Sequence, residues 1–260
     1  MVFTADISNS GITLAVFTEK GELIFRSDIS TDKSRSADEY FILLSNIFSL
    51  HGADPKSVEG AIISSVVPPL TNTFRNAAKK LLGCKPLLVG PGIKTGLDIK
   101  IDHHYELGSD LVANTVAASA LYKPPFVIID LDTATTFTAV NANGELCGVI
   151  ILPGVRTSLD ALSASAAELP YISIGRPKSL LGTNTVDSMN AGIVYGTSSM
   201  LDGLIDRLIN EFNTGDIDII ITGESASRFI PYCRHEMSYE PDLAVKGLYM
   251  IYRKNRKKYK

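Results

Sequence analysis

The sequence of 260 residues contains no tryptophan, only three cysteines and no long hydrophobic run. Cys84, Cys147 and Cys233 are far apart and odd in number, which indicates neither a disulfide framework nor a CxxC metal site, so we expect buried, inert thiols. No segment approaches the roughly 18 apolar residues of a membrane span, and the N-terminal residues lack a signal-peptide pattern. We therefore expect a cytoplasmic protein without a membrane partner.

Neither sign of charge dominates, since the net charge is −3, and only four histidines are present. His103 and His104 are adjacent while His51 and His235 stand alone, a spacing that does not indicate a zinc site. Residues 253–260 form a basic run that could bind nucleic acid but is more often a solvated end. Because the whole chain is negative even with this run included, we expect no nucleic-acid partner.

An internal repeat organises the chain. Segments 4–17 and 128–141 have similar sequences, and Asp6 matches Asp130 about 124 residues later. Each copy combines an apolar strand, an Asp among small polar residues, a second apolar strand and a glycine turn that leads into a third strand. This order predicts a three-stranded β-meander in each half.

Helical sequence follows each meander. Ser36 and Glu39 form a capping-box pattern ahead of one expected helix, and Gly83 is a stop signal for another. Further elements are expected as helices over 70–82, 111–122, 157–169 and 186–212, as strands over 61–67 and 217–221, and as another helix after Gly223. We therefore predict an α/β chain of duplicated βββαβα lobes, 1–122 and 123–260, with two mixed sheets and a cleft between the lobes.

The two Asp turns suggest a shared chemistry. A tight turn of small residues brings backbone N–H groups close to a phosphate, and an Asp at the strand end can hold a cation or water. Two such turns facing each other would bind a polyphosphate from both sides. Either Asp6 or Asp130 alone could be an ordinary turn residue, but their repetition favours a binding role.

Several motifs then resemble one family. Asp6-Ile-Ser-Asn-Ser10 is similar to a DxGNT phosphate motif, residues 130–136 to DFGTATT, and Thr222-Gly223-Glu224 to a TGG adenosine motif. The order and spacing of further motifs match as well, at residues 64–70, 90–97, 108–110, 153–154 and 182–189. Over nearly its whole length the chain resembles type III pantothenate kinases. The resemblance implies ribonuclease H-like lobes of the actin-like ATPase superfamily, which also includes sugar kinases and Hsp70.

The resemblance implies a transferase that uses ATP with Mg²⁺ to phosphorylate the 4′-hydroxyl of pantothenate, in coenzyme A biosynthesis. Asp110 matches the family's catalytic carboxylate. It lies at the start of a predicted helix, where the helix dipole favours the ionised form that a base requires. An ordinary first-turn helix Asp is the alternative for this residue.

The remaining roles also come from the resemblance. ATP would contact Asp6, Ser8, Asn9, Ser10, Thr133 and Gly223, and Asp130 would hold a monovalent cation such as K⁺ or NH₄⁺. Pantothenate would contact Ile101, Gly108, Ser109, Asp110, Leu111 and Thr185, with Thr185 supplied by the partner of a homodimer. Segment 190–208 has small and apolar residues on more than one face, as a helix packed on two sides requires, although a single core helix would also fit.

The differences from the family pattern fall in the site. Glycines of the family are replaced by Ser8, Asp132 and Glu224, the family's substrate-site Tyr by Ile101 and its Arg by Leu111, while Ser10 stands for a Thr. Asp132 adds negative charge where polyphosphate is expected, and Leu111 cannot pair with the carboxylate of pantothenate. A catalytically impaired paralogue with a binding or regulatory role is therefore the alternative function.

Overall fold

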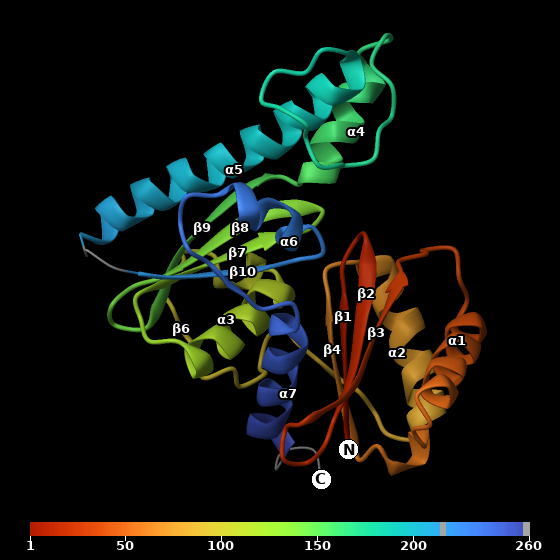
Figure 1. Cartoon of the computed structure of the whole chain (residues 1–260). Helices are drawn as coiled ribbons and strands as arrows, with labels where there is room; N and C mark the ends of the chain where they lie inside the picture. Colours follow the sequence, from red (N-terminus) through yellow and green to blue (C-terminus); the bar gives the residue numbers. More distant parts are fainter. Residues whose placement is uncertain (214–216, 257–260) are drawn as a thin grey trace. The chain divides into compact units, whose positions relative to one another are not determined.

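The computed structural model describes residues 1–213 and 217–256 (Figure 1). The chain divides into two compact units. The first contains Met1–Leu97, Asp102–Leu121 and the C-terminal segment that begins at Asp242, and the second contains Asp98–Ile101 and Tyr122–Pro241. The C-terminal helix α7 (Leu243–Asn255) thus packs in the unit formed by the first half, whereas the division drawn on the sequence groups it with the second half. A cleft between the lobes stays a prediction.

The first unit is built on a five-stranded mixed sheet with the order β3-β2-β1-β4-β5. Its strands are β1 (Val2–Ile7), β2 (Gly11–Phe17), β3 (Leu23–Ser30), β4 (Gly60–Ser65) and β5 (Leu87–Leu88). The first three strands form the expected antiparallel meander, and β4 runs parallel to β1. The parallel pairing aligns Asp6 with Ser64, so the polar ends of these two strands lie side by side.

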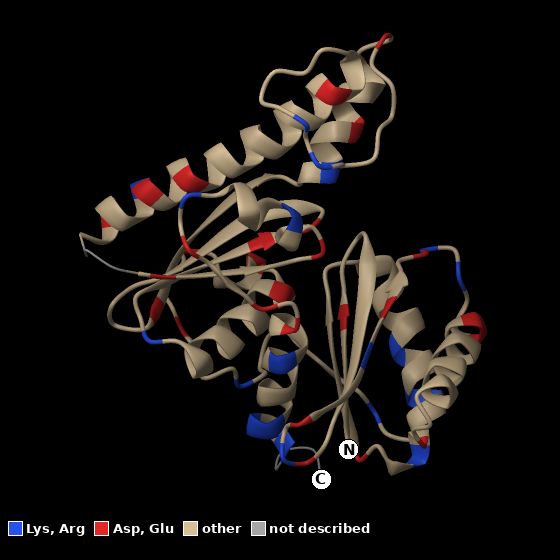
Figure 2. Cartoon of the chain, in the orientation of Figure 1, with Lys and Arg blue, Asp and Glu red and all other residues tan. Residues whose placement is uncertain are grey.

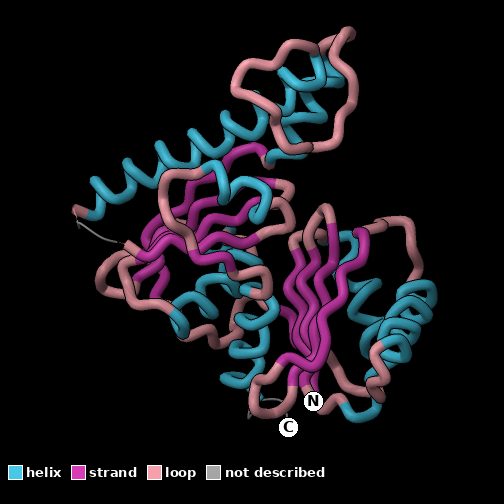
Figure 3. Tube along the Cα trace, in the orientation of Figure 1, coloured by secondary structure: helices cyan, strands magenta, loops and turns pink. Residues whose placement is uncertain are grey.

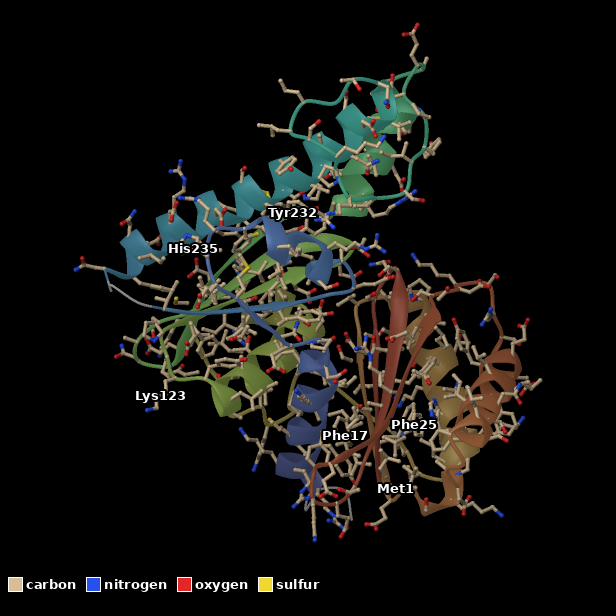
Figure 4. The ribbon with its side chains drawn as sticks, in the orientation of Figure 1. Met1, Phe17, Phe25, Lys123, Tyr232 and His235 are labelled. Atoms are coloured by element: carbon tan, nitrogen blue, oxygen red, sulfur yellow. The ribbon has the colours of Figure 1, made fainter. Side chains whose placement is uncertain are left out.

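Helices cover both faces of this sheet (Figure 3). They are α1 (Ala37–Leu50), α2 (Pro68–Leu82), α3 (Ser109–Leu121) and α7, with short 3-10 turns η1 (Pro55–Ser57) and η2 (His104–Glu106). Phe25 on one face packs against Phe48 of α1, with ring centroids 5.4 Å apart, and Phe17 on the other packs against Tyr249 of α7 at 5.1 Å (Figure 4). The alternation of side chains along each strand produces these two apolar layers.

The second unit repeats the pattern in a six-stranded mixed sheet with the order β11-β10-β7-β8-β9-β6. Its strands are β6 (Asp98–Ile99), β7 (Phe126–Leu131), β8 (Ala134–Val140), β9 (Glu145–Pro153), β10 (Asp218–Thr222) and β11 (Ser238–Tyr239). In both units the pairing between the second and third strands of the meander contains a register shift. It lies between Val16 and Phe17 in β2 and between Ala139 and Val140 in β8. The duplicated meander and the two mixed sheets that the sequence predicts are therefore confirmed.

The helices of this unit are α4 (Val155–Ser165), α5 (Thr185–Phe212) and the short α6 (Ala226–Phe229), which is followed by the 3-10 turn η3 (Ile230–Tyr232). One apolar core joins α5 and α6 to the sheet through residues such as Ile129 and Phe137. The helix expected over 157–169 is wrong at its end, because α4 stops at Ser165. Pro170 restricts the residue before it to extended backbone, and its carbonyl accepts a hydrogen bond from Ser163 Oγ at 2.9 Å.

Local signals for the other elements hold. Ser36 and Glu39 make the reciprocal capping box at the start of α1, and Gly83 ends α2 in the left-handed conformation at φ +71°. The expectation of buried cysteines is wrong for Cys147, which is exposed on β9, while Cys84 and Cys233 are half-buried. Burial raises the pKa of the Cys233 thiol to about 11, which is consistent with an inert group.

Basic residues gather near the end of α7 (Figure 2). Arg256 there forms ion pairs with Glu19 and Glu59, at 2.8 and 2.9 Å. The rest of the basic run, 257–260, lies outside the described residues. Across the part of the chain that the structure describes, none of the helices combines the length and the hydrophobicity needed to cross a membrane.

Candidate active site

The first phosphate turn joins β1 to β2 and contains Ser8, Asn9 and Ser10. Its ends are closed by hydrogen bonds from Ser8 N to Gly11 O at 2.9 Å and from Gly11 N to Ser8 Oγ at 3.2 Å. The hydroxyls of Ser8 and Ser10 are 3.0 Å apart. Among the described non-glycine residues only Asn213 has a positive φ, so Ser8 occupies the family's glycine position with an ordinary backbone and closes the turn with its side chain.

The loop between β3 and α1 supports this turn. Thr31 Oγ1 donates to Ser8 O at 2.7 Å, and Thr31 N donates to Ser10 O at 3.3 Å. Lys33 Nζ donates to Asn9 Oδ1 at 3.2 Å and so brings a positive charge to the turn. The sequence analysis did not identify Lys33, because no local pattern connects it to a turn 24 residues earlier.

Asp110 is positioned by a hydrogen-bond network at the end of β4. Ser109, the first residue of α3, has its Oγ 2.8 Å from Ser64 Oγ and accepts from Ser65 N at 3.1 Å. Ser64 is buried and pairs with Asp6 across the sheet. The first unit therefore brings Ser109, which would contact the acceptor, to the strand end that carries Asp6, which would contact ATP, and Asp110 follows directly after Ser109.

Gly108 gives Asp110 its space. A Cβ atom at residue 108 would overlap Asp110 Oδ1, so any side chain there would displace the carboxylate. The carbonyl of Gly108 accepts the first helical hydrogen bond, from Val112 N at 3.2 Å, which places Asp110 in the first turn of α3. A carboxylate in that turn is stabilised in its ionised form by the helix dipole.

Leu111 replaces the family's arginine, and its side chain is buried. Because leucine is uncharged, this position offers no cation to a substrate carboxylate. Two cations of the second unit, Lys100 and Arg156, are engaged in ion pairs within that unit. Lys100 pairs with Asp98 at 3.2 Å and Glu145 at 3.6 Å. Arg156 pairs with Asp160 at 2.7 Å. Lys94 is exposed and forms no ion pair among the described residues.

The second phosphate turn, between β7 and β8, is held against the start of α4. Thr133 O accepts from Gly154 N at 3.0 Å and from Thr157 Oγ1 at 2.9 Å. A Cβ atom at Gly154 would overlap the carbonyl oxygens of Asp132 and Thr133, so glycine is required there by close approach. The side chain of Thr133 is exposed.

Gly223 completes this edge of the second sheet. It has φ +99°, and a Cβ atom on it would overlap the backbone of Leu131. Thr222 pairs with Asp130 in the parallel register of β10 and β7, so Glu224 follows close to the turn of Asp132 and Thr133. Asp130, Thr133 and Gly223 therefore lie at the same edge of the second sheet.

Thr136 was not identified from the sequence as a site residue. It is the cross-strand partner of Asp130 on β8, so both side chains project from the same face. Its Oγ1 is buried and has no hydrogen-bond partner among the described residues. A threonine within a strand does not by itself indicate a site residue, and only the strand register shows that Thr136 lies opposite Asp130.

Thr185 and Ile101 do not belong to the phosphate turn of the second unit. Thr185 is exposed at the start of α5, after the N-cap Asn184, whose Oδ1 accepts from Asp187 N at 2.9 Å. Ile101 follows the short edge strand β6 and is half-exposed. No hydrogen bond among the described residues of this unit joins either one to the Asp130 turn.

The site offers few protein ligands for a divalent ion. Over residues 1–213 and 217–256, no three His, Cys, Asp or Glu side chains are grouped so that they could hold a metal ion. Mg²⁺ typically takes one or two carboxylates and completes its shell with phosphate oxygens and water. The residues present therefore fit a metal that arrives with a nucleotide.

Comparison with known proteins agrees with these motifs. A sequence model of the family described as type III pantothenate kinase matches residues 2–207. The type III pantothenate kinase of Pelobacter propionicus is 41% identical over 256 residues, which cover 98% of this chain and 100% of that protein. The type III pantothenate kinase of Geobacter sulfurreducens is 40% identical over 257 residues, with 98% and 100% covered.

Solved structures support the fold. The activator of 2-hydroxyisocaproyl-CoA dehydratase from Clostridium difficile, with bound ADPNP, has a TM-score of 0.56 at 11% identity, with 99% of this chain and 98% of that chain covered. The ethanolamine utilization protein EutJ from Carboxydothermus hydrogenoformans has a TM-score of 0.55 at 12% identity, with 96% and 89% covered. With its family model and its full-length relatives near 40% identity, the chain belongs to the type III pantothenate kinase family.

Proposed function

We propose that this protein is an ATP-dependent pantothenate kinase that transfers the γ-phosphoryl group to the 4′-hydroxyl of pantothenate in coenzyme A biosynthesis. The observation that carries the proposal is the anchoring of Asp110. The Ser64–Ser109 hydrogen bond anchors the start of α3 to the end of β4, and the space left by Gly108 accommodates the carboxylate of Asp110, which supports this role. Full-length relatives that are named as type III pantothenate kinases support the same function.

Asp110 acts as the base that orients and accepts the hydroxyl proton of the substrate. Phosphoryl transfer depends mainly on positioning and on neutralising charge, so the reaction does not require a strong base. The turns at Ser8–Ser10 and at Thr133, with Gly223, bind the nucleotide. Mg²⁺ bound with the nucleotide would neutralise charge on its phosphates, and the use of ATP as donor supports a cytoplasmic enzyme.

Asp130 is the proposed ligand of a monovalent cation, K⁺ or NH₄⁺. The buried Thr136 hydroxyl on the same face adds a second oxygen ligand, which is the donor type that a hard cation prefers. When bound, the cation neutralises negative charge beside the polyphosphate. This role is consistent with a turn that also contains Asp132.

The glycine replacements support a working nucleotide site. Ser8, Asp132 and Glu224 have negative φ angles, whereas Gly223, the one glycine that the backbone conformation requires, is retained. This favours a kinase over the impaired paralogue, since the replacements cause no backbone strain. The acceptor side differs more, because Leu111 is buried and Lys100 and Arg156 are already paired.

We also propose that the enzyme is a homodimer formed through α5, with Thr185 reaching the acceptor site of the partner. One face of α5 is buried in its own unit, and on the opposite face Gly192, Gly196 and Gly203 have open space around them. Small residues at this spacing allow close helix packing. The loop before α5 also exposes Tyr171, Leu180 and Leu181, at 67%, 67% and 81%.

One assay tests the proposed function. ADP release is measured with ATP and Mg²⁺, in K⁺ or Na⁺ buffer, with pantothenate present or omitted, and the product is identified by mass spectrometry. We expect ADP release that depends on pantothenate and is faster in K⁺, with 4′-phosphopantothenate as the product. Binding of ATP without any phosphorylated pantothenate would instead support the impaired paralogue.

A further inference from the structure

Lys33 contacts the first phosphate turn from a separate loop. Its Nζ donates to Asn9 Oδ1 at 3.2 Å, and its side chain is exposed. Among the described residues, no carboxylate oxygen lies within 4.0 Å of this ammonium group. Some other lysines of the chain are engaged in ion pairs, for example Lys80 with Asp38 at 2.9 Å and Lys178 with Asp187 at 3.0 Å.

The backbone around Lys33 is fixed on both sides. Asp32, the residue before Lys33, is held by the buried side chain of Tyr40. Tyr40 Oη accepts from Asp32 N at 3.2 Å and donates to Asp32 O at 2.9 Å. Ser34 N donates to Asp32 Oδ1 at 2.9 Å on the other side. Thr31 attaches the same loop to the turn through Ser8 O. The position of Lys33 over the turn is therefore built into the fold.

The acidic neighbour of Lys33 does not neutralise it. Asp32 accepts hydrogen bonds from Ser34 N and Oγ and forms an ion pair with Arg35 Nε at 3.4 Å. The hydrogen bonds from Ser34 hold the pKa of Asp32 below its ordinary value, so this carboxylate stays charged and its partners are local. The positive charge of Lys33 therefore remains available to a ligand.

The turn itself presents donors in the same place. The carbonyl oxygens of Ser8 and Ser10 are both occupied by Thr31. Asn9 is exposed, and its backbone N–H has no acceptor among the residues that the structure describes. An amide N–H and an ammonium group at one exposed turn are the donors that phosphate oxygens require.

We propose that Lys33 is a phosphate-binding residue of the nucleotide site, which contacts the polyphosphate of ATP together with the backbone of the Ser8–Ser10 turn. This inference rests on the proposed function, because it assigns a residue to the nucleotide site of that kinase. Lys33 also supplies a positive charge at a site where glycines of the family are replaced.

Isothermal titration calorimetry with ATP, ADP and AMP, each with Mg²⁺, tests the assignment on the full-length protein. Lys33→Gln should raise the Kd for ATP about 10-fold, the effect of one charge-assisted hydrogen bond at an exposed site. The change for AMP should be under about 2-fold, because AMP lacks the outer phosphates. Lys33→Arg should keep most of the affinity. Lys56→Gln, an exposed lysine on η1, is the matched control and should bind ATP like the wild type.

The outcomes separate the two proposals. If the wild type binds ATP and Lys33→Gln binds it equally well, the Lys33 assignment is wrong and the kinase proposal stands. If Lys33→Gln weakens ATP binding while pantothenate is never phosphorylated, Lys33 binds phosphate and the proposed acceptor is wrong. If the wild type binds neither ATP nor inorganic triphosphate, both proposals are overturned. Thermal melting of each variant confirms that the fold is intact.

Discussion

The hydroxyl oxygens of Ser64 and Ser109 lie 2.8 Å apart, and their hydrogen bond joins the end of β4 to the first residue of α3. Ser109 Oγ also accepts from Ser65 N, so one side chain satisfies two groups of the strand. Asp110 is the next residue. The position of the proposed base therefore depends on a neutral serine that takes no part in proton transfer.

Ser109→Ala tests this dependence. The variant removes the acceptor of Ser65 N and the partner of the buried Ser64 hydroxyl, which should lower the free energy of unfolding by about 1–3 kcal/mol. We expect kcat to fall by about 10-fold or more, with the KM for ATP nearly unchanged. Ser49→Ala, at an exposed position of α1, is the control. An unchanged kcat would show that Ser109 does not position Asp110.

Asp110→Asn keeps the size of the side chain and removes its ability to accept a proton. Turnover should fall by about 10²-fold or more, within the usual range for the loss of a general base, and the melting temperature should change little. Steady-state ADP release measures the effect. Glu168→Gln, an exposed carboxylate between α4 and α5, is the control. Equal turnover in Asp110→Asn and wild type would make Asp110 an ordinary first-turn helix residue.

Asp132 should weaken ATP binding by charge repulsion. Its φ is not positive, so glycine is not needed there for the backbone, and Asp132→Asn and Asp132→Gly should both lower the Kd for ATP by about 5-fold or more. Calorimetry with and without Mg²⁺ makes the comparison. If both variants bind ATP more weakly and the loss requires Mg²⁺, Asp132 is instead a metal ligand.

Gly154 should be required at the second phosphate turn. In Gly154→Ala, the new Cβ would overlap the carbonyl oxygens of Asp132 and Thr133, which should cost about 1–3 kcal/mol of stability and weaken ATP binding. Gly148→Ala on β9, the strand that ends directly before Gly154, is a matched control, because no atom lies within 4 Å of its added Cβ. Thermal denaturation and calorimetry should separate the two variants, and equal behaviour would contradict the proposed close approach.

The homodimer predicts a response of α5 to substitution. Light scattering of the wild type at micromolar concentration should give twice the 28.1 kDa chain mass. Gly196→Arg places a long charged side chain on the open face of α5 and should give a monomer. Glu211→Arg, away from the glycine positions of the same helix, should stay a dimer. A monomeric wild type would rule out assembly through α5.

Elements with local signals were predictable. The β-meanders follow from alternating apolar residues and glycine turns, and the start of α1 follows from its capping box. The elements that were not predicted include β5, β6, β11 and α7, which depend on pairing or packing with other parts of the chain. The strands β5 and β6 are two residues long, and α7 packs on β1 and α3 from the far end of the chain.

The site shows the same division at the level of single residues. The sequence by itself determined the duplicated strands and the repeated pair Asp6 and Asp130, because their turns are short-range features, while the family resemblance pointed to Asp110 and Gly223. Only the tertiary structure decided which glycine the backbone requires, since Gly223 has φ +99° while Asp132 and Glu224 do not need a positive φ. It also brought Lys33 to Asn9 and Thr136 to Asp130. Pairings of this kind arise from strand register and loop docking, which join residues that no local pattern connects.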